Sequence, residues 1–64
     1  MTFADKVKYV RAELIISQTE LAKLIGVSFS TINRWETGKL GPSFLAEKKF
    51  EAFCKNKNIV FKEN

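Results

Sequence analysis

The segment from Ser28 to Trp35, SFSTINRW, combines several side chains that form directional hydrogen bonds. If it is a helix with Ile32 and Trp35 facing a core, a rotation of about 100° per residue places the polar side chains on the outer side. Arginine can bind guanine through two hydrogen bonds, amides and hydroxyls suit other base edges, and an apolar ring suits the thymine methyl group. The residues expected to read bases are Ser28, Phe29, Ser30, Asn33 and Arg34.

The alternative interpretation is that this outer side is simply a solvated helix surface. It explains Ser30, Asn33 and Arg34 adequately, because polar side chains are usual on exposed helices. It explains Phe29 less well, unless the ring packs on a neighbouring helix or on a partner. For Phe29 the contact with a base and the packing role both remain open.

Two short helices joined by a glycine must position this segment. Ser17 and Glu20 form a capping-box pattern, which predicts a helix over residues 18–25. Gly26 suits the left-handed turn that ends a helix, and Ser28 can cap a second helix that runs to about residue 37. A helix, a short glycine turn and a second helix form a helix-turn-helix unit, here at about 18–37. The side chains expected to face inward are Leu21, Leu24, Ile25, Val27, Ile32 and Trp35, with Ala22 small enough for close packing.

Two further helices should complete the core. Thr2 can cap a helix that ends near residue 14, and Ser43, after the breaker TGKLGP, can cap another over residues 44–55. Cys54 is expected to be a small core residue. In the tail, Ile59 and Phe61 alternate with Val60 and Lys62, which favours a short extended piece. The expected buried residues are Phe3, Val7, Val10 and Leu14 in the first helix and Leu45, Ala46, Phe50 and Phe53 in the last.

Composition narrows the class of protein. A chain of 64 residues with 45% hydrophobic residues predicts a single domain, 1–64, and its net charge of +4 suits an anionic partner. One cysteine and no histidine argue against a disulfide or a metal site. We expect no cofactor and no enzymatic activity, because the sequence has no phosphate-binding loop, nucleophile motif or evident catalytic carboxylate pair. It also shows no membrane-spanning run and no signal peptide, so a cytoplasmic, nucleoid-associated location is expected.

The segment SQTELAKLIGVSFSTINRWETGK, residues 17–39, resembles the DNA-binding core of the Cro and phage-repressor (XRE-type) helix-turn-helix family. The elements that carry the resemblance are the Q-x-x-L-A-x-x-x-G-V core and the W-E-x-G-K ending, at the family's spacing. A weaker resemblance extends over about residues 2–53. The resemblance implies an all-α, compact four- or five-helix lambda-repressor-like domain from bacteria or phage. It also implies that the third helix enters the major groove of double-stranded DNA.

The same resemblance places phosphate contacts around the reading face. Gln18 begins the second helix, where a glutamine side chain and free backbone N–H groups suit a phosphate. Lys39 lies in the loop where the family binds phosphate, and Thr37 lies on the outer side of the helix before it. Glu36 should point toward the core and needs a partner, for which Arg11 is well placed. The family commonly joins these two positions, so a structural Arg11–Glu36 pair is expected.

The expected function is therefore a sequence-specific regulator of transcription, most simply a repressor. The alternatives are a protein-interaction or antitoxin-type module, and the targeting domain of a larger DNA-processing enzyme. A homodimer is possible, through a strand at Ile59–Phe61 or through Leu40 and Phe44. A tail folded over its own core is at least as good an interpretation of Ile59–Phe61.

Overall fold

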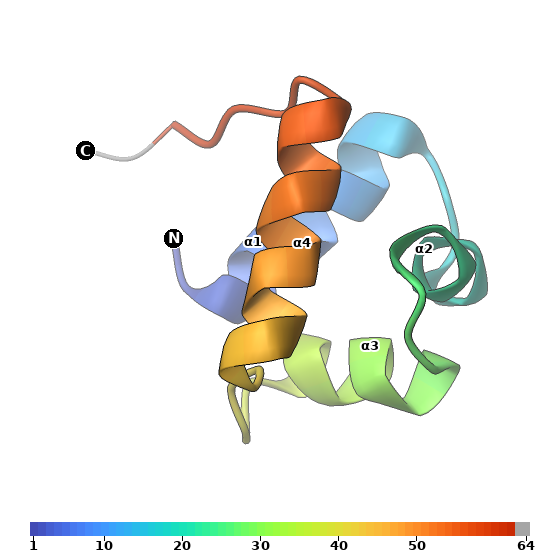
Figure 1. Cartoon of the computed structure of the whole chain (residues 1–64), viewed down its shortest axis with the longest axis vertical. Coiled ribbons are helices and arrows are strands. Elements are labelled where there is room, and N and C mark those ends of the chain that lie inside the picture. The colour runs from blue at the N-terminus through green and yellow to red at the C-terminus, as the bar shows by residue number, and fades with distance from the viewer. Residues whose placement is uncertain (63–64) are drawn as a thin grey trace.

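The computed structural model describes residues 1–62, and four helices follow one another along this part of the chain (Figure 1). They are α1 (Phe3–Leu14), α2 (Gln18–Ile25), α3 (Phe29–Thr37) and α4 (Phe44–Asn56). No strand occurs among these residues, so the predicted all-α fold is confirmed, with four helices. None of the helices in residues 1–62 is long and apolar enough to cross a membrane.

Each helix begins at the capping residue that the sequence predicts. The side-chain oxygen of the cap accepts a hydrogen bond from the backbone N–H three residues on, which satisfies a donor that the helix leaves unpaired. In α1 and α2 an acidic residue, Asp5 or Glu20, returns the bond to the cap's own N–H and completes a capping box. The four capping residues are Thr2, Ser17, Ser28 and Ser43.

The turn between α2 and α3 is made by a glycine in the left-handed conformation. Gly26 has φ 89° and ψ 37°, and its N–H donates to the carbonyl of Ala22 at 2.8 Å. A residue with a Cβ adopts this conformation only at a cost, which explains the glycine. The turn lets α3 leave α2 at a steep angle, and Figure 1 shows α2 nearly end-on beside the length of α3.

The core lies where the four helices meet. α3 packs against α1 and α2, and α2 also packs against α4. Three rings from three helices meet edge to face: Phe3 lies 5.2 Å from Trp35 and 5.1 Å from Phe50 between ring centroids. The buried residues are Val7, Val10, Leu21, Ala22, Ile32, Trp35, Phe50 and Cys54.

Two leucines that were expected in the core are exposed. Leu24 is 52% exposed and Leu45 is 70% exposed. Leu24 lies about 60° round α2 from the buried Leu21, at the edge of the inward stripe. Leu45 lies about 140° round α4 from the buried Phe50, on nearly the opposite side. Both predictions are wrong. Leu24 lies at the edge of its stripe, and for Leu45 the apolar residue type alone does not show which side of α4 meets the core.

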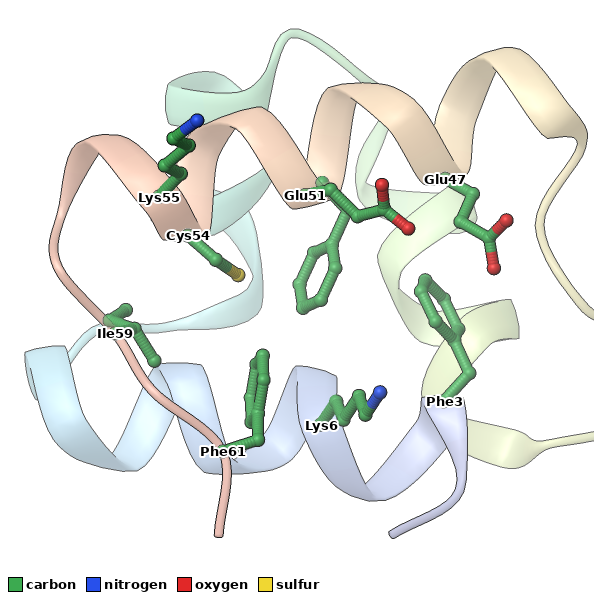
Figure 2. A pocket seen from close by; sticks show the side chains of 9 residues that line it. Phe3, Lys6, Glu47, Glu51, Cys54, Lys55, Ile59 and Phe61 are labelled. Atoms are coloured by element: carbon green, nitrogen blue, oxygen red, sulfur yellow. The ribbon is translucent and has the colours of Figure 1, made fainter. Parts of the chain in front are cut away.

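The tail after α4 folds back over the protein's own core. Ile59 and Phe61 are half-buried and pack against the core, whereas Val60 between them is 75% exposed. The Phe61 ring lies 5.6 Å from the ring of Tyr9 on α1. Residues 57–62 form no strand, and with α1 and α4 they border an open pocket of about 330 Å³, which Ile59, Phe61, Phe3 and Cys54 help to line (Figure 2). Burial alternates along residues 59–62 as the sequence pattern does, and this part of the tail covers the protein's own core.

Candidate nucleic-acid interface

The outer side of α3 is an exposed polar surface. Ile32 is fully buried and Trp35 is 3% exposed, so these two residues fix the inward direction of the helix. Ser30, Asn33 and Arg34 are exposed on the remaining surface. Phe29, in the first turn, keeps 50% of its surface exposed. Figure 1 shows α3 along one edge of the helix bundle, so one side of this helix has no other helix packed on it.

The exposed charges of α3 and the following loop are positive. Arg34 and Lys39 are exposed, and within residues 1–62 neither side chain has a hydrogen-bond or ion-pair partner. The only acid of the helix is Glu36, whose side chain is 8% exposed and turned toward α1. An anion that approaches the outer side therefore meets the cations without a nearby exposed carboxylate of α3.

Arg11 of α1 and Glu36 of α3 form a bidentate ion pair. Its Nε donates to Glu36 Oε2 at 2.6 Å, and its second guanidinium nitrogen, Nη2, donates to Glu36 Oε1 at 2.8 Å. Its Nη1 reaches the carbonyl of Ile16 at 3.4 Å. The hydrogen bonds from Arg11 lower the pKa of Glu36, burial opposes this shift, and a bond from Gln18 adds to the lowering. The structure thus brings together the two residues that the sequence pairs, and the pair ties α3 to α1.

Gln18 connects this ion pair to the outer side of α3. Its Nε2 donates to Glu36 Oε1 at 3.1 Å, and its Oε1 accepts from Asn33 Nδ2 at 3.4 Å. Sequence reasoning assigned Gln18 to phosphate and Asn33 to bases, and it missed this contact between them. A partial signal was available, because Asn33 and Glu36 are three residues apart and share one flank of α3. The position of Gln18 opposite that flank depends on the packing of α2.

The first turn of α2 keeps two backbone donors available. The N–H groups of Ser17 and Glu20 are used in the capping box. Those of Gln18 and Thr19 have no acceptor among the residues that the structure describes. Free N–H groups at a helix N-terminus suit a phosphate oxygen. They lie beside the Gln18 side chain, which itself touches the outer flank of α3 through Asn33.

Two of the expected contact residues use their hydroxyls locally. Ser28 Oγ accepts from the backbone N–H of Thr31 at 3.1 Å and lies 2.8 Å from Thr31 Oγ1. Thr37 Oγ1 donates to the carbonyl of Arg34 at 2.8 Å. For Thr37 to donate to a phosphate, its hydroxyl would have to leave this bond. By contrast, Ser30 has no side-chain hydrogen bond within residues 1–62.

Comparison of the sequence with protein-family models identifies the family of this domain. Residues 7–53 match the family model described as Helix-turn-helix (HTH_3), which is the Cro/C1-type, XRE-like family. The matched range contains α2, the glycine turn and α3 completely and most of α1 and α4. Curated proteins and solved structures gave no significant match. The chain belongs to this helix-turn-helix family, and residues 7–53 form a DNA-binding domain of that type.

Proposed function

We propose that this helix-turn-helix protein is a sequence-specific regulator that reads the major groove of double-stranded DNA with α3. The observation that carries the proposal is the outer side of α3, where Arg34 and two further polar side chains project from a helix whose opposite side is buried. A helix presented in this way fits the width of the major groove. In helix-turn-helix proteins the start of the recognition helix lies closest to the bases.

Each residue of this surface has a role that its chemistry suits. The unpaired guanidinium of Arg34 binds O6 and N7 of a guanine through two hydrogen bonds. The hydroxyl of Ser30 and the amide of Asn33 bond to neighbouring base edges. The half-exposed ring of Phe29 lies against a thymine methyl group. Ser28 contacts DNA through the part of its hydroxyl that the cap leaves accessible.

Phosphate contacts on both sides of α3 set its register on the duplex. On one side, the free N–H groups of Gln18 and Thr19 and the side chain of Gln18 hold a phosphate oxygen. On the other side, Lys39 binds the backbone of the second strand, and Thr37 adds a weaker contact when its hydroxyl turns outward. Arg11 and Glu36 do not touch DNA in this proposal, and they hold α3 in place.

Repression is the simplest regulatory outcome, because it requires only that the site be occupied. We propose that residues 1–64 act as one domain in the cytoplasm, bound to the nucleoid. A second copy on a near-palindromic site would double the contacts and raise specificity. No enzymatic step and no cofactor enter the proposal.

Selection of bound duplexes from a random DNA pool tests the proposal. The expected result is a consensus sequence with two-fold symmetry, or a half-site if one copy binds alone. Arg34→Ala should then weaken binding to the selected site by about 1–3 kcal/mol and relax the preference at one G·C pair. The matched control is Lys39→Ala, which should weaken binding to all duplexes by a similar factor and leave the consensus unchanged. A pool that shows no enrichment would contradict the proposal.

Salt dependence provides an independent test. The affinity should fall by about 0.9 log units per log unit of salt for each phosphate that the protein neutralises. Lys39→Ala should reduce the magnitude of this slope by about 0.9, which is the contribution of one phosphate contact. A salt-independent affinity would argue against phosphate contacts altogether.

A second candidate function, protein binding, is favoured by a group of exposed apolar side chains. Leu40 is 64% exposed, Phe44 is 72% exposed and Leu45 is 70% exposed, and all three lie in or next to the loop that leads into α4. Such residues at one place suit contact with another protein or with a second copy. Light scattering of the parent and of Phe44→Ser, with and without DNA, tests whether these side chains join two copies of the protein. A dimer that Phe44→Ser dissociates supports the apolar contact, and a monomer under both conditions contradicts self-association.

A further inference from the structure

The side chains of Glu36, Gln18 and Asn33 form a chain of hydrogen bonds with a fixed direction. Glu36 is ionised beside Arg11, so its oxygens only accept hydrogen bonds. Gln18 must therefore turn its Nε2 toward Glu36 Oε1, as it does at 3.1 Å. This leaves Gln18 Oε1 facing α3, where it accepts from Asn33 Nδ2 at 3.4 Å. The charge of Glu36 thus decides which end of each amide faces its neighbour.

The direction of this chain leaves Asn33 with a defined pair of groups for a ligand. One proton of Nδ2 is used by Gln18, so the carbonyl Oδ1 and the second N–H proton remain. Asn33 itself is exposed on the outer flank of α3. A neighbouring acceptor and donor on one amide match N6–H and N7 of adenine in the major groove. Guanine presents two acceptors there, so the Asn33 carbonyl would face an acceptor.

We propose that Asn33 is a specificity-determining residue that reads adenine, and that Gln18 and Glu36 are positioning residues that fix the orientation of its amide. The inference rests on the proposed function, in which α3 lies in the major groove. It assigns Gln18 a role besides phosphate binding. A reversed Asn33 amide would bring its Oδ1 against Gln18 Oε1, two acceptors that repel each other. Reversing Gln18 as well would bring its Oε1 against the Glu36 carboxylate, so neither alternative keeps all the hydrogen bonds.

The size of the effect follows from one lost orienting hydrogen bond. A bond of this kind contributes modestly to the preference for one orientation, and its loss should reduce the discrimination for adenine about 3- to 10-fold. Loss of a phosphate contact has a different signature, because phosphate lies at every base pair and its contacts carry no sequence information. The ratio of affinities for two duplexes that differ at one base pair therefore isolates the orienting role.

The experiment starts from the sequence that a random pool selects. Asn33→Ala identifies the base pair that Asn33 reads, as the position at which the preference disappears. Gln18→Met keeps the length of the side chain and removes both of its hydrogen bonds. Leu24→Met is the matched control, because Leu24 is 52% exposed on the same helix, has no role in the proposed DNA contact and lies outside the chain of hydrogen bonds. Affinity ratios are then measured for duplexes with each of the four bases at that position.

The expected result is adenine at the position that Asn33 reads, with a discrimination that Gln18→Met reduces about 3- to 10-fold and Leu24→Met leaves unchanged. A different base at that position, or an undiminished adenine preference in Gln18→Met, would overturn the inference and leave the proposed function standing. A parent protein without any base preference would overturn the proposed function together with the adenine assignment. In the free protein, the side-chain NH₂ signals of Asn33 should shift in Gln18→Met and stay in place in Leu24→Met. Unchanged signals in both variants would contradict the orienting contact itself.

Discussion

Replacing Arg11 by methionine tests the claim that the Arg11–Glu36 pair holds α3 in its position. The change removes two short hydrogen bonds, of 2.6 and 2.8 Å, and leaves the Glu36 carboxylate with Gln18 as its remaining side-chain donor within residues 1–62. The side chain of Glu36 is 8% exposed and that of Arg11 is 28% exposed. Breaking a fully buried pair costs about 3–5 kcal/mol, and exposed pairs are worth about 0–1 kcal/mol. With Arg11 partly exposed, we expect Arg11→Met to lose about 2–3 kcal/mol of unfolding free energy.

Thermal and urea unfolding, followed by circular dichroism at neutral pH, measure this loss. For a chain of this size, about 2–3 kcal/mol corresponds to a fall in Tm of about 10–20 °C. Lys48→Met is the matched control, because Lys48 and Glu51 form an ion pair at 3.3 Å with both side chains more than half exposed. The control should lose no more than about 1 kcal/mol. If Arg11→Met loses no more unfolding free energy than the control does, the pair does not anchor α3.

The same pair predicts how stability depends on pH. Hydrogen bonds from Arg11 lower the pKa of Glu36 in the folded protein below its value in the unfolded chain. The stabilisation is therefore fully present above the unfolded pKa of about 4.3 and is lost as the pH falls through the lower, folded pKa. The difference in stability between the parent and Arg11→Met should shrink over this acid range. A difference that stays constant down to low pH would contradict the ionic character of the contact.

Three further substitutions or reactions probe particular features of the fold. Gly26→Ala should lower the free energy of unfolding in urea by about 1–2 kcal/mol, because φ is 89° at this position. A steric clash is not the reason, since no atom lies within 4 Å of the added Cβ. The control is Gly41→Ala, where φ is not positive and the space is equally open, and it should change stability by less than about 1 kcal/mol. Ile15→Gly should raise the unfolding free energy by about 0.5–1 kcal/mol, since a β-branched residue that is 89% exposed holds φ 54°; an unchanged or lower Tm would refute this. Burial raises the pKa of the Cys54 thiol to about 11, so iodoacetamide at pH 8 should modify it far more slowly than free cysteine until urea unfolds the chain.

The helices could be predicted from the sequence because their signals are local. Ser17 and Ser28 start α2 and α3, and Gly26 ends α2, through hydrogen bonds that span only a few residues. The inward direction of α3 follows from Ile32 and Trp35, which lie three residues apart on one helix face. The exposed surface of α3 could be expected from the same two residues, because it is what remains when they are buried.

Features that depend on packing between helices were less accessible. The exposure of Leu45 depends on which side of α4 meets the core, and an apolar residue type does not give that direction. The contact between Gln18 and Asn33 joins two helices at an angle that only the folded turn defines. The Arg11–Glu36 contact could be anticipated because a carboxylate that points inward requires a cation, and Arg11 flanks the facing stripe of α1.

The most direct test of the central claim is to map the DNA contact onto the protein by NMR. A duplex selected from the random pool is titrated into ¹⁵N-labelled protein, and the shift of each backbone amide is followed. If α3 reads the DNA, the largest shifts should lie in Ser28–Arg34, at Gln18 and Thr19, and at Lys39. Largest shifts on the lysine-bearing surface of α4, at Lys48, Lys49 and Lys55, with the amides of α3 unmoved, would contradict the account.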